Sequence, residues 1–172
     1  IENDGNNFIY APLVNYADHT FSVCKKMLDD KNAIMGLGDG GAHVGFILDA
    51  GYPTWLISYW SVKKKVYSME ETVRRLTSDT ANAAGLNDRG LLKVGLKADI
   101  NIIDWENVGS SDPFMTQDLP AGGKRLMQHT QGYVTTIVSG KVTYKNGEFT
   151  KERPGTVVKS VKDKEKTLEF IN

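Results

Sequence analysis

The chain has 172 residues, which is enough for one domain of ordinary size or two small ones. Hydrophobic residues make up 40% of it, and no apolar run approaches the roughly 20 residues that a membrane-spanning helix needs, so we expect a globular protein that crosses no membrane. Its 21 basic and 21 acidic residues cancel, which argues against nucleic-acid binding, and its single cysteine excludes an internal disulfide and is typical of a reducing, cytoplasmic compartment.

A helix and a buried strand are predicted over the first part of the chain. Apolar residues recur at helical spacing over residues 18–30, with Asp18 or Thr20 as the N-cap. Residues 33–38 form a short apolar run that ends in glycines, as expected for a buried strand. The apolar face of the helix has three members, and we expect them to pack in the core: Phe21, Cys24 and Leu28.

Two further helical segments are predicted downstream. The aromatic run TWLISYW follows Pro53, whose fixed φ suits the first turn of a helix. The helix over residues 69–84 has the clearest signals, because Ser68 and Glu71 have the spacing of a capping box and Gly85 stands where a left-handed C-terminal cap is expected. Its apolar face is predicted to consist of Met69, Val73, Leu76 and Thr80.

From about Gly90 the apolar residues alternate with a period of two, which predicts β-strands. The dipeptides Ser139-Gly140 and Asn146-Gly147 would each join two short strands, and Asn-Gly is the preferred sequence of a type I′ hairpin turn. Residues 106–128 contain two prolines and few periodic positions, so they are predicted to be a loop. The second half is therefore expected to be a β domain.

The run IMGLGDGGAHVG places Asp39 and His43 among glycines, where the chain must turn sharply or let another group approach its backbone. A carboxylate directly after a buried strand points to chemistry, because the carboxyl ends of parallel strands form the ligand crevice. On its own, an Asp-Gly pair is more often a simple turn. A lone histidine is likewise more often structural than a metal ligand, and His19 and His129 are weaker candidates still.

Three blocks of sequence occur in the order and spacing of a known family. The chain resembles the last third of an N-acyl-D-amino-acid deacylase of the amidohydrolase superfamily. The blocks are GLGDGGAHVG, RLTSDTANAAGLNDRGLLKVGLKADINIID and DLPAGGKRLMQHTQGYVTTIVSGKVTYKNGEFTKERPG. The second block is shared by many amidohydrolases, whereas GDGGAH and LPAGGKRLMQ are narrower and point to the D-aminoacylase-like branch.

The resemblance implies an α/β fold, namely the C-terminal part of a (β/α)₈ barrel followed by a small β-sandwich segment. Residues 18–30 would form the seventh barrel helix, residues 33–38 the eighth strand and residues 69–84 the last helix. The expected domains are the barrel part over residues 1–88, the sandwich segment, to which both ends of the chain would contribute, over residues 89–159, and a charged tail over residues 160–172.

The resemblance also implies metal-dependent hydrolysis of the amide bond of N-acyl-(D-)amino acids. Asp39 would take a proton from a metal-bound water and pass it to the leaving amine, or would itself be a metal ligand. His43 would contact the substrate. The expected cofactor of the complete enzyme is zinc, as one or two divalent ions, and we expect this chain alone to hold none tightly.

The metal-ligand histidines of the family are not in this sequence, and a complete barrel of this kind takes roughly 250 residues. We therefore expect an incomplete, inactive portion, with the remainder of the barrel upstream or in another chain, or in a second copy within a homo-oligomer. The expected partners are that remainder and an N-acyl amino acid substrate, with no nucleic acid and no membrane. Two alternatives stay open: a non-catalytic amidohydrolase-like scaffold or assembly protein, and an independent binding module in the β half.

Overall fold

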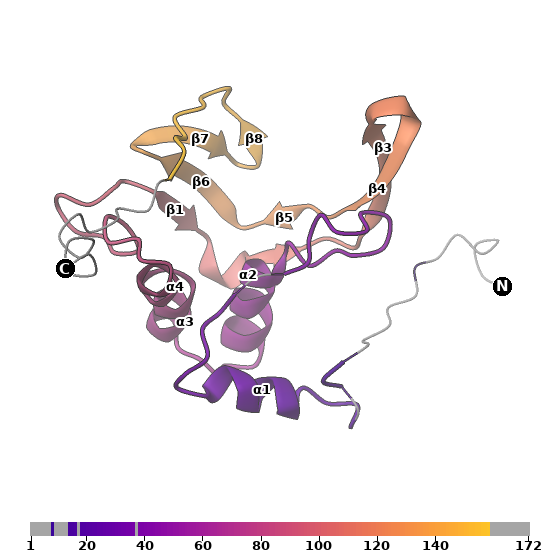
Figure 1. Ribbon diagram of the computed structural model, residues 1–172, viewed down its shortest axis with the longest axis horizontal. Coiled ribbons are helices and arrows are strands. Elements are labelled where there is room, and N and C mark those ends of the chain that lie inside the picture. Colours follow the sequence, from indigo (N-terminus) through magenta and orange to yellow (C-terminus); the bar gives the residue numbers. More distant parts are fainter. Residues whose placement is uncertain (1–7, 9–13, 17, 37, 159–172) are drawn as a thin grey trace, which may run out of the picture.

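The computed structural model describes residues 8, 14–16, 18–36 and 38–158. Its helices precede its longer strands along the chain, and Figure 1 shows the two groups side by side. The helices are α1 (Ser22–Asp29), α2 (Tyr52–Trp55), the π-helix η2 (Leu56–Lys63), α3 (Met69–Leu76) and α4 (Ser78–Ala83), with short 3₁₀ turns η3 (Trp105–Asn107) and η4 (Pro120–Gly122). The strands are β1 (Ile100–Ile103), β2 (Gly109–Ser110), β3 (Phe114–Leu119), β4 (Gly123–Met127), β5 (Thr130–Gln131), β6 (Tyr133–Val138), β7 (Lys141–Lys145) and β8 (Glu148–Phe149).

The core lies where α1, the π-helix η2 and the segment before α3 meet. Leu56, Trp60 and Tyr67 form the buried cluster at this place. The predicted apolar face of α1 is confirmed, because all three of its members pack against the cluster: Phe21, Cys24 and Leu28. The aromatic run after Pro53 is helical as predicted, with Pro53 in the first turn of α2, although Trp55 is 40% exposed.

Helix α1 begins later than the sequence predicts, with Phe21 at its N-cap position. The Asp18 carboxylate instead closes the preceding turn, accepting hydrogen bonds from the Thr20 N–H at 3.0 Å and the Ser22 hydroxyl at 2.6 Å. Hydrogen bonds from Ser22 and Thr20 lower the pKa of Asp18 to about 2. Asp18 and Thr20 therefore order the turn before the helix, and neither is its N-cap.

A hydrogen bond between two elements ties the end of α1 to the core. The Tyr67 hydroxyl donates to Asp29 Oδ1 at 2.8 Å, and the Arg75 guanidinium lies 4.6 Å from the centre of the Tyr67 ring. Burial of Tyr67, together with this hydrogen bond, raises the pKa of its hydroxyl to about 12. The phenol therefore stays protonated and keeps donating at any physiological pH.

The predicted helix over residues 69–84 is two helices, α3 and α4, with a break at Thr77. The backbone angles of Thr77 are φ −125° and ψ −84°, and the Thr77 hydroxyl donates to the Val73 carbonyl at 2.6 Å. Such a side-chain bond competes with the helical hydrogen bonds.

Gly90 also packs against this region, since a Cβ on it would lie 2.8 Å from the Ala81 Cβ.

The predicted apolar face of this helical region is only partly correct. Leu76 packs against the core cluster, but Met69 and Val73 are 47% and 42% exposed. The fully buried position in α3 is Thr72, whose hydroxyl donates to the Ser68 carbonyl at 2.8 Å. That bond satisfies the polar group, so the threonine can be buried in place of a larger apolar residue.

The predicted strand over residues 33–38 is wrong for the residues that can be described there. Residues 33–36 and 38 belong to no strand. Their sequence is apolar enough for a buried strand, but a strand also needs a neighbour to satisfy its backbone, and no described segment pairs with them. Met35 instead packs against the core cluster. The described residues form no barrel, and membership of a (β/α)₈ barrel stays a prediction.

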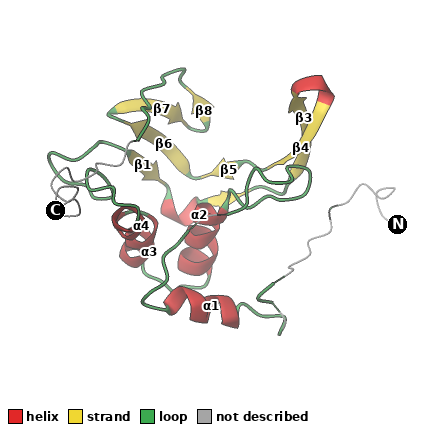
Figure 2. Ribbon diagram, in the orientation of Figure 1, coloured by secondary structure: helices red, strands yellow, loops and turns green. Residues whose placement is uncertain are grey.

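The described residues of the second half form three antiparallel sheets, which Figure 2 shows in yellow. The largest has the strand order β1-β6-β7-β8, and the others are the pairs β2-β5 and β3-β4. Both predicted turns are confirmed as type I′, because Ser139 and Gly140 have φ 49° and 77°, and Asn146 and Gly147 have φ 49° and 83°. The four-stranded sheet and the two ribbons occupy the region in which a sandwich segment was expected.

The loop predicted for residues 106–128 is wrong, because most of this stretch is the β3-β4 ribbon. Phe114 pairs with Met127 at one end of the ribbon. Nearer the turn, Nε and Nη2 of Arg125 donate to the two oxygens of the Asp118 carboxylate, at 2.8 and 2.6 Å. These cross-strand contacts cannot be read from a local period, and Pro120 lies in the turn η4, where it interrupts no ladder.

The division into domains at residue 88 stays a prediction. The longer helices end at Ala83, and the first strand begins at Ile100. The two regions are joined by a hydrogen bond of 2.9 Å between the hydroxyls of Thr54 and Tyr133. The predicted tail over residues 160–172 lies outside the described residues.

The N-cap of α3 provides a direct test of the fold. The Ser68 hydroxyl accepts a hydrogen bond from the Glu71 N–H at 3.1 Å, so Ser68→Ala should lower the free energy of unfolding by about 1 kcal/mol. Ser78→Ala is the control, because the Ser78 hydroxyl makes only a long bond of 3.4 Å to the Arg74 carbonyl. Chemical denaturation that shows the same stability for both variants would contradict the cap.

The β7-β8 turn provides a second test. Gly147 has φ 83° and no neighbouring atom where a Cβ would stand, so only its backbone conformation opposes a side chain. Gly147→Val should therefore destabilise the protein by about 1–2 kcal/mol. Gly155→Val is the matched control, because Gly155 is equally open and has no positive φ. Thermal melts in which the two valine variants lose equal stability would rule out the type I′ turn.

Candidate functional site

Asp39 and His43 lie on the segment between α1 and α2. We call residues 38–50 of this segment the glycine loop. Two successive turns build its first part. The Ala42 N–H donates to the Asp39 carbonyl at 2.9 Å, and the N–H groups of Phe46 and Ile47 donate to the His43 carbonyl at 2.9 and 3.1 Å. The simple-turn interpretation of the Asp-Gly pair is thus confirmed for the backbone, and it leaves the Asp39 carboxylate exposed.

The two ends of the glycine loop touch, and this contact explains two of its glycines. A Cβ on Gly38 would lie 2.6 Å from the Asp49 carbonyl oxygen, and a Cβ on Gly40 would lie 2.9 Å from both the Cβ and the backbone nitrogen of Ala50. Separations this short leave no room for a side chain. The close approach anticipated from the sequence is therefore made, at these two positions, by the chain itself.

The loop is also attached to the β half. The Leu126 N–H of β4 donates to the Val44 carbonyl at 2.8 Å. A Cβ on Gly51, just after the loop, would lie 3.2 Å from the Gln128 side-chain oxygen. In Figure 1 the loop accordingly runs beside β4. The loop that begins with the GDGGAH motif is thereby in contact, through Val44, with the LPAGGKRLMQ motif, although the two are far apart along the chain.

His43 has an unusual backbone conformation and a stacked side chain. Its φ of 45° lies in the left-handed region that residues other than glycine rarely adopt. Its ring stacks on that of Phe46, with centroids 5.1 Å apart and planes 26° from parallel. Both side chains are exposed, Phe46 to 69%. The structure thus places an aspartate, a histidine and a phenylalanine on one exposed loop, and the phenylalanine was missed from the sequence.

The described residues do not by themselves fit a metal ion. Among them, no group of three histidine, cysteine, aspartate or glutamate residues is placed to hold one. The two weaker histidine candidates make aromatic contacts. The ring centroid of His19 lies 6.2 Å from that of Tyr16 in an edge-on arrangement, and the ring centroid of His129 lies 4.8 Å from that of Phe114. The role of Asp39 as a metal ligand stays a prediction, and so does the zinc cofactor.

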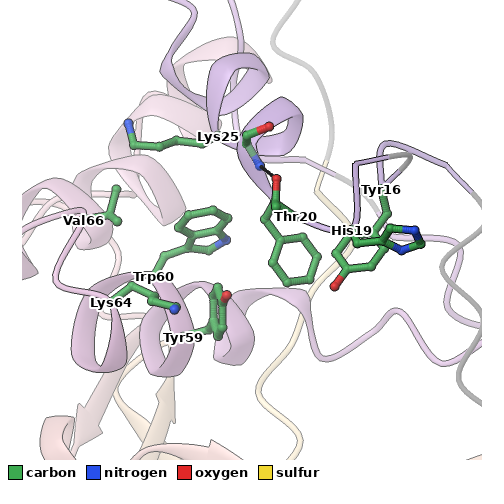
Figure 3. Close-up of a pocket in the computed structure, with 10 residues that line it drawn as sticks. Tyr16, His19, Thr20, Lys25, Tyr59, Trp60, Lys64 and Val66 are labelled. Atoms are coloured by element: carbon green, nitrogen blue, oxygen red, sulfur yellow. Dashed lines mark hydrogen bonds between the residues drawn. The ribbon is translucent and has the colours of Figure 1, made fainter.

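A separate hollow of about 420 Å³ opens beside the aromatic core (Figure 3). The ring centroids of Phe21 and Tyr59 lie 6.2 and 5.3 Å from that of Trp60, whose buried Nε1 has no hydrogen-bond partner among the described residues. Lys64 lies over the Tyr59 ring with its Nζ 5.6 Å from the centroid. Among the described residues that line the hollow there is no carboxylate, and its aromatic residues are the feature by which the sequence could have indicated it.

A helix that crosses a membrane must be long and apolar. Throughout the portion of the chain that the structure describes, every helix is too short or too polar to do so.

Comparison with known proteins connects most of the chain to one family. A model described as "Amidohydrolase family" matches residues 11–144. The curated proteins that match include a dihydroorotase of Lactobacillus acidophilus, 34% identical over 89 residues, and one of Bacillus cereus strain B4264, 39% identical over 88 residues. These segments cover 49% and 48% of this chain but only 20% and 19% of the relatives. The matched region therefore spans about one fifth of their length. No solved structure matches the chain.

The contact between the two ends of the glycine loop can be tested by adding one methyl group. Gly38→Ala should cost about 1–3 kcal/mol of stability, because its Cβ would be forced against the Asp49 carbonyl. Gly36→Ala should be nearly neutral, because no atom lies within 4 Å of the corresponding position. Equal denaturation midpoints for the two variants would show that the loop ends are not in contact.

Proposed function

Because the chain belongs to the amidohydrolase family, we propose that it is a segment of an enzyme that hydrolyses an amide C–N bond. The observation that carries the proposal is the exposed Asp39 carboxylate on a loop whose backbone is fixed at several points. The loop ends touch at Gly38 and Gly40, and its middle is bonded to β4. A rigidly held, accessible carboxylate is what general acid–base catalysis needs.

In this proposal Asp39 moves a single proton in two steps. Its carboxylate oxygen accepts the proton of the water whose oxygen attacks the amide carbonyl carbon. The same oxygen then gives that proton to the amide nitrogen as the C–N bond breaks, so that a carboxylic acid and an amine leave the site. The carboxylate ends as it began. Each transfer needs hydrogen-bond reach between Asp39 and the reacting atom.

A divalent metal such as zinc would lower the pKa of its bound water to about 7 and so supply the nucleophile. The described residues do not fit such an ion. Its ligands would have to come from the remainder of a longer protein or from another chain. We expect that remainder to be the principal partner of this chain.

We propose N-acyl-(D-)amino acids as the substrates. The proposal is supported by the narrow motifs GDGGAH and LPAGGKRLMQ, which the resemblance connects with the D-aminoacylase-like branch. In the structure Val44, the residue that follows GDGGAH, is hydrogen-bonded to Leu126 of LPAGGKRLMQ, so the two motifs lie on connected segments, as two parts of one substrate site would. His43, on the same loop as Asp39, would contact the bound substrate.

A second candidate is the hydrolysis of dihydroorotate, which is favoured by the names of the matched relatives. A third is a non-catalytic scaffold, which would have no need of a carboxylate at position 39. Turnover separates the three. N-Acetyl-D-amino acids, their L-enantiomers and dihydroorotate should be offered to the full-length protein, and we expect hydrolysis of the first group.

Asp39→Asn tests the catalytic assignment. The amide keeps the shape of the side chain but cannot accept the proton, so kcat of the full-length enzyme should fall by about 10²–10⁴-fold. Asp49→Asn is the matched control, because it changes an exposed aspartate in the same loop and should leave kcat unchanged. An Asp39→Asn enzyme with wild-type turnover would overturn the assignment.

Metal analysis of the same variants separates the two roles of Asp39. A proton carrier can be replaced without loss of metal, whereas loss of an essential ligand should lower metal content together with rate. The isolated 172-residue chain is a further control, and we expect no hydrolysis by it with or without added zinc. Turnover by the isolated chain would refute the view that the metal ligands lie elsewhere.

A further inference from the structure

The glycine loop exposes one large apolar side chain, that of Phe46, to solvent. It is 69% exposed, and a single exposed phenylalanine on a surface needs no explanation by itself. This ring, however, is not left to move freely, because it lies stacked on the His43 ring with centroids 5.1 Å apart. The contact orders the ring without burying it.

The backbone of the loop imposes this arrangement. His43 has φ 45°, which is costly for a residue with a side chain, and its carbonyl accepts the N–H groups of both Phe46 and Ile47. The next residue, Val44, is bonded to β4. Strain of this kind persists only where the surrounding structure enforces it, and it is common at ligand-binding sites.

Phe46 also belongs to the same compact unit as Asp39. Asp39 accepts at the start of the first turn of the loop, and His43 accepts at the start of the second, which closes on Phe46. The side chains at all three positions are exposed. A substrate that brought its scissile amide to the carboxylate would therefore have an ordered aromatic surface within two turns of the backbone.

We infer that Phe46 is a specificity-determining residue that contacts an apolar or aromatic group attached beside the scissile amide, with His43 holding its ring in place. The inference rests on the proposed function and adds the chemical class of the substrate. Contact between two apolar surfaces removes both from water, and aromatic rings gain further from offset or edge-on packing. Substrates without such a group would lose this contribution.

Three N-acyl amino acids test the inference in the full-length enzyme. N-Acetylglycine has no large apolar group, N-benzoylglycine has one on the acyl side, and N-acetyl-D-phenylalanine has one on the amino acid. In Phe46→Ala, the kcat/KM of one aromatic substrate relative to that of N-acetylglycine should fall by about 10-fold. The substrate that is affected identifies which side of the amide faces Phe46.

Two further variants make the result specific. Phe46→Leu keeps an apolar side chain and should restore part of the preference, and it replaces Phe46→Ala if that variant fails to fold. Phe149→Ala is the matched control, because Phe149 is 42% exposed and its ring centroid lies 5.3 Å from that of Tyr144 in the β7-β8 hairpin. It should leave the substrate preference unchanged.

The unfavourable outcomes can be told apart. An unchanged ratio in Phe46→Ala, or an equal loss with all three substrates, would overturn the inference while leaving the proposed function intact. A wild-type enzyme that hydrolyses none of the three would overturn both. A lower ratio accompanied by an unchanged melting temperature would establish a role in recognition and exclude one in folding.

Discussion

The geometry of the candidate site depends on the contact between the two ends of the glycine loop. Gly38 and Gly40 lie so close to Asp49 and Ala50 that no side chain fits between them. This contact closes the loop on itself, so that its middle projects away from the helices as two tight turns. Without it, the loop would keep only its bond to β4, and Asp39 would be held less firmly.

The bond between Val44 and Leu126 gives the loop its second point of support and connects the site to the β half. The β3-β4 ribbon therefore supports the candidate site. Its strands pair with each other and not with the four-stranded sheet, and one of them holds the loop. A substitution that shifted β4 would also shift the loop that holds Asp39. This is a reason to treat the two halves of the chain as parts of one site.

Features that depend on neighbouring residues could be predicted from the sequence, and features that depend on distant ones could not. The cap at Ser68 and the turn at Asn146-Gly147 are local, and both are confirmed. The β3-β4 ribbon depends on pairing between two strands, which no local pattern predicts. Residues 33–36 were predicted to be part of a strand from their apolar sequence, but no described segment pairs with them. At the site, Asp39 and His43 were indicated by the glycine-rich run and by the family resemblance, and Asp39 also by its place after a predicted strand that the described residues do not form. Phe46 was missed, because its importance lies in exposure and stacking, which have no sequence signature.

The loop itself also bears on the choice between an enzyme and a scaffold. Close packing explains Gly38 and Gly40, so these two glycines would be equally necessary in a protein without activity. Asp39 and His43 support the loop through their carbonyl groups, and no hydrogen bond of their side chains is found within the described residues. A carboxylate at position 39 is thus not required by the fold that presents it. Its chemical identity needs another explanation, and proton transfer to a bound amide supplies one.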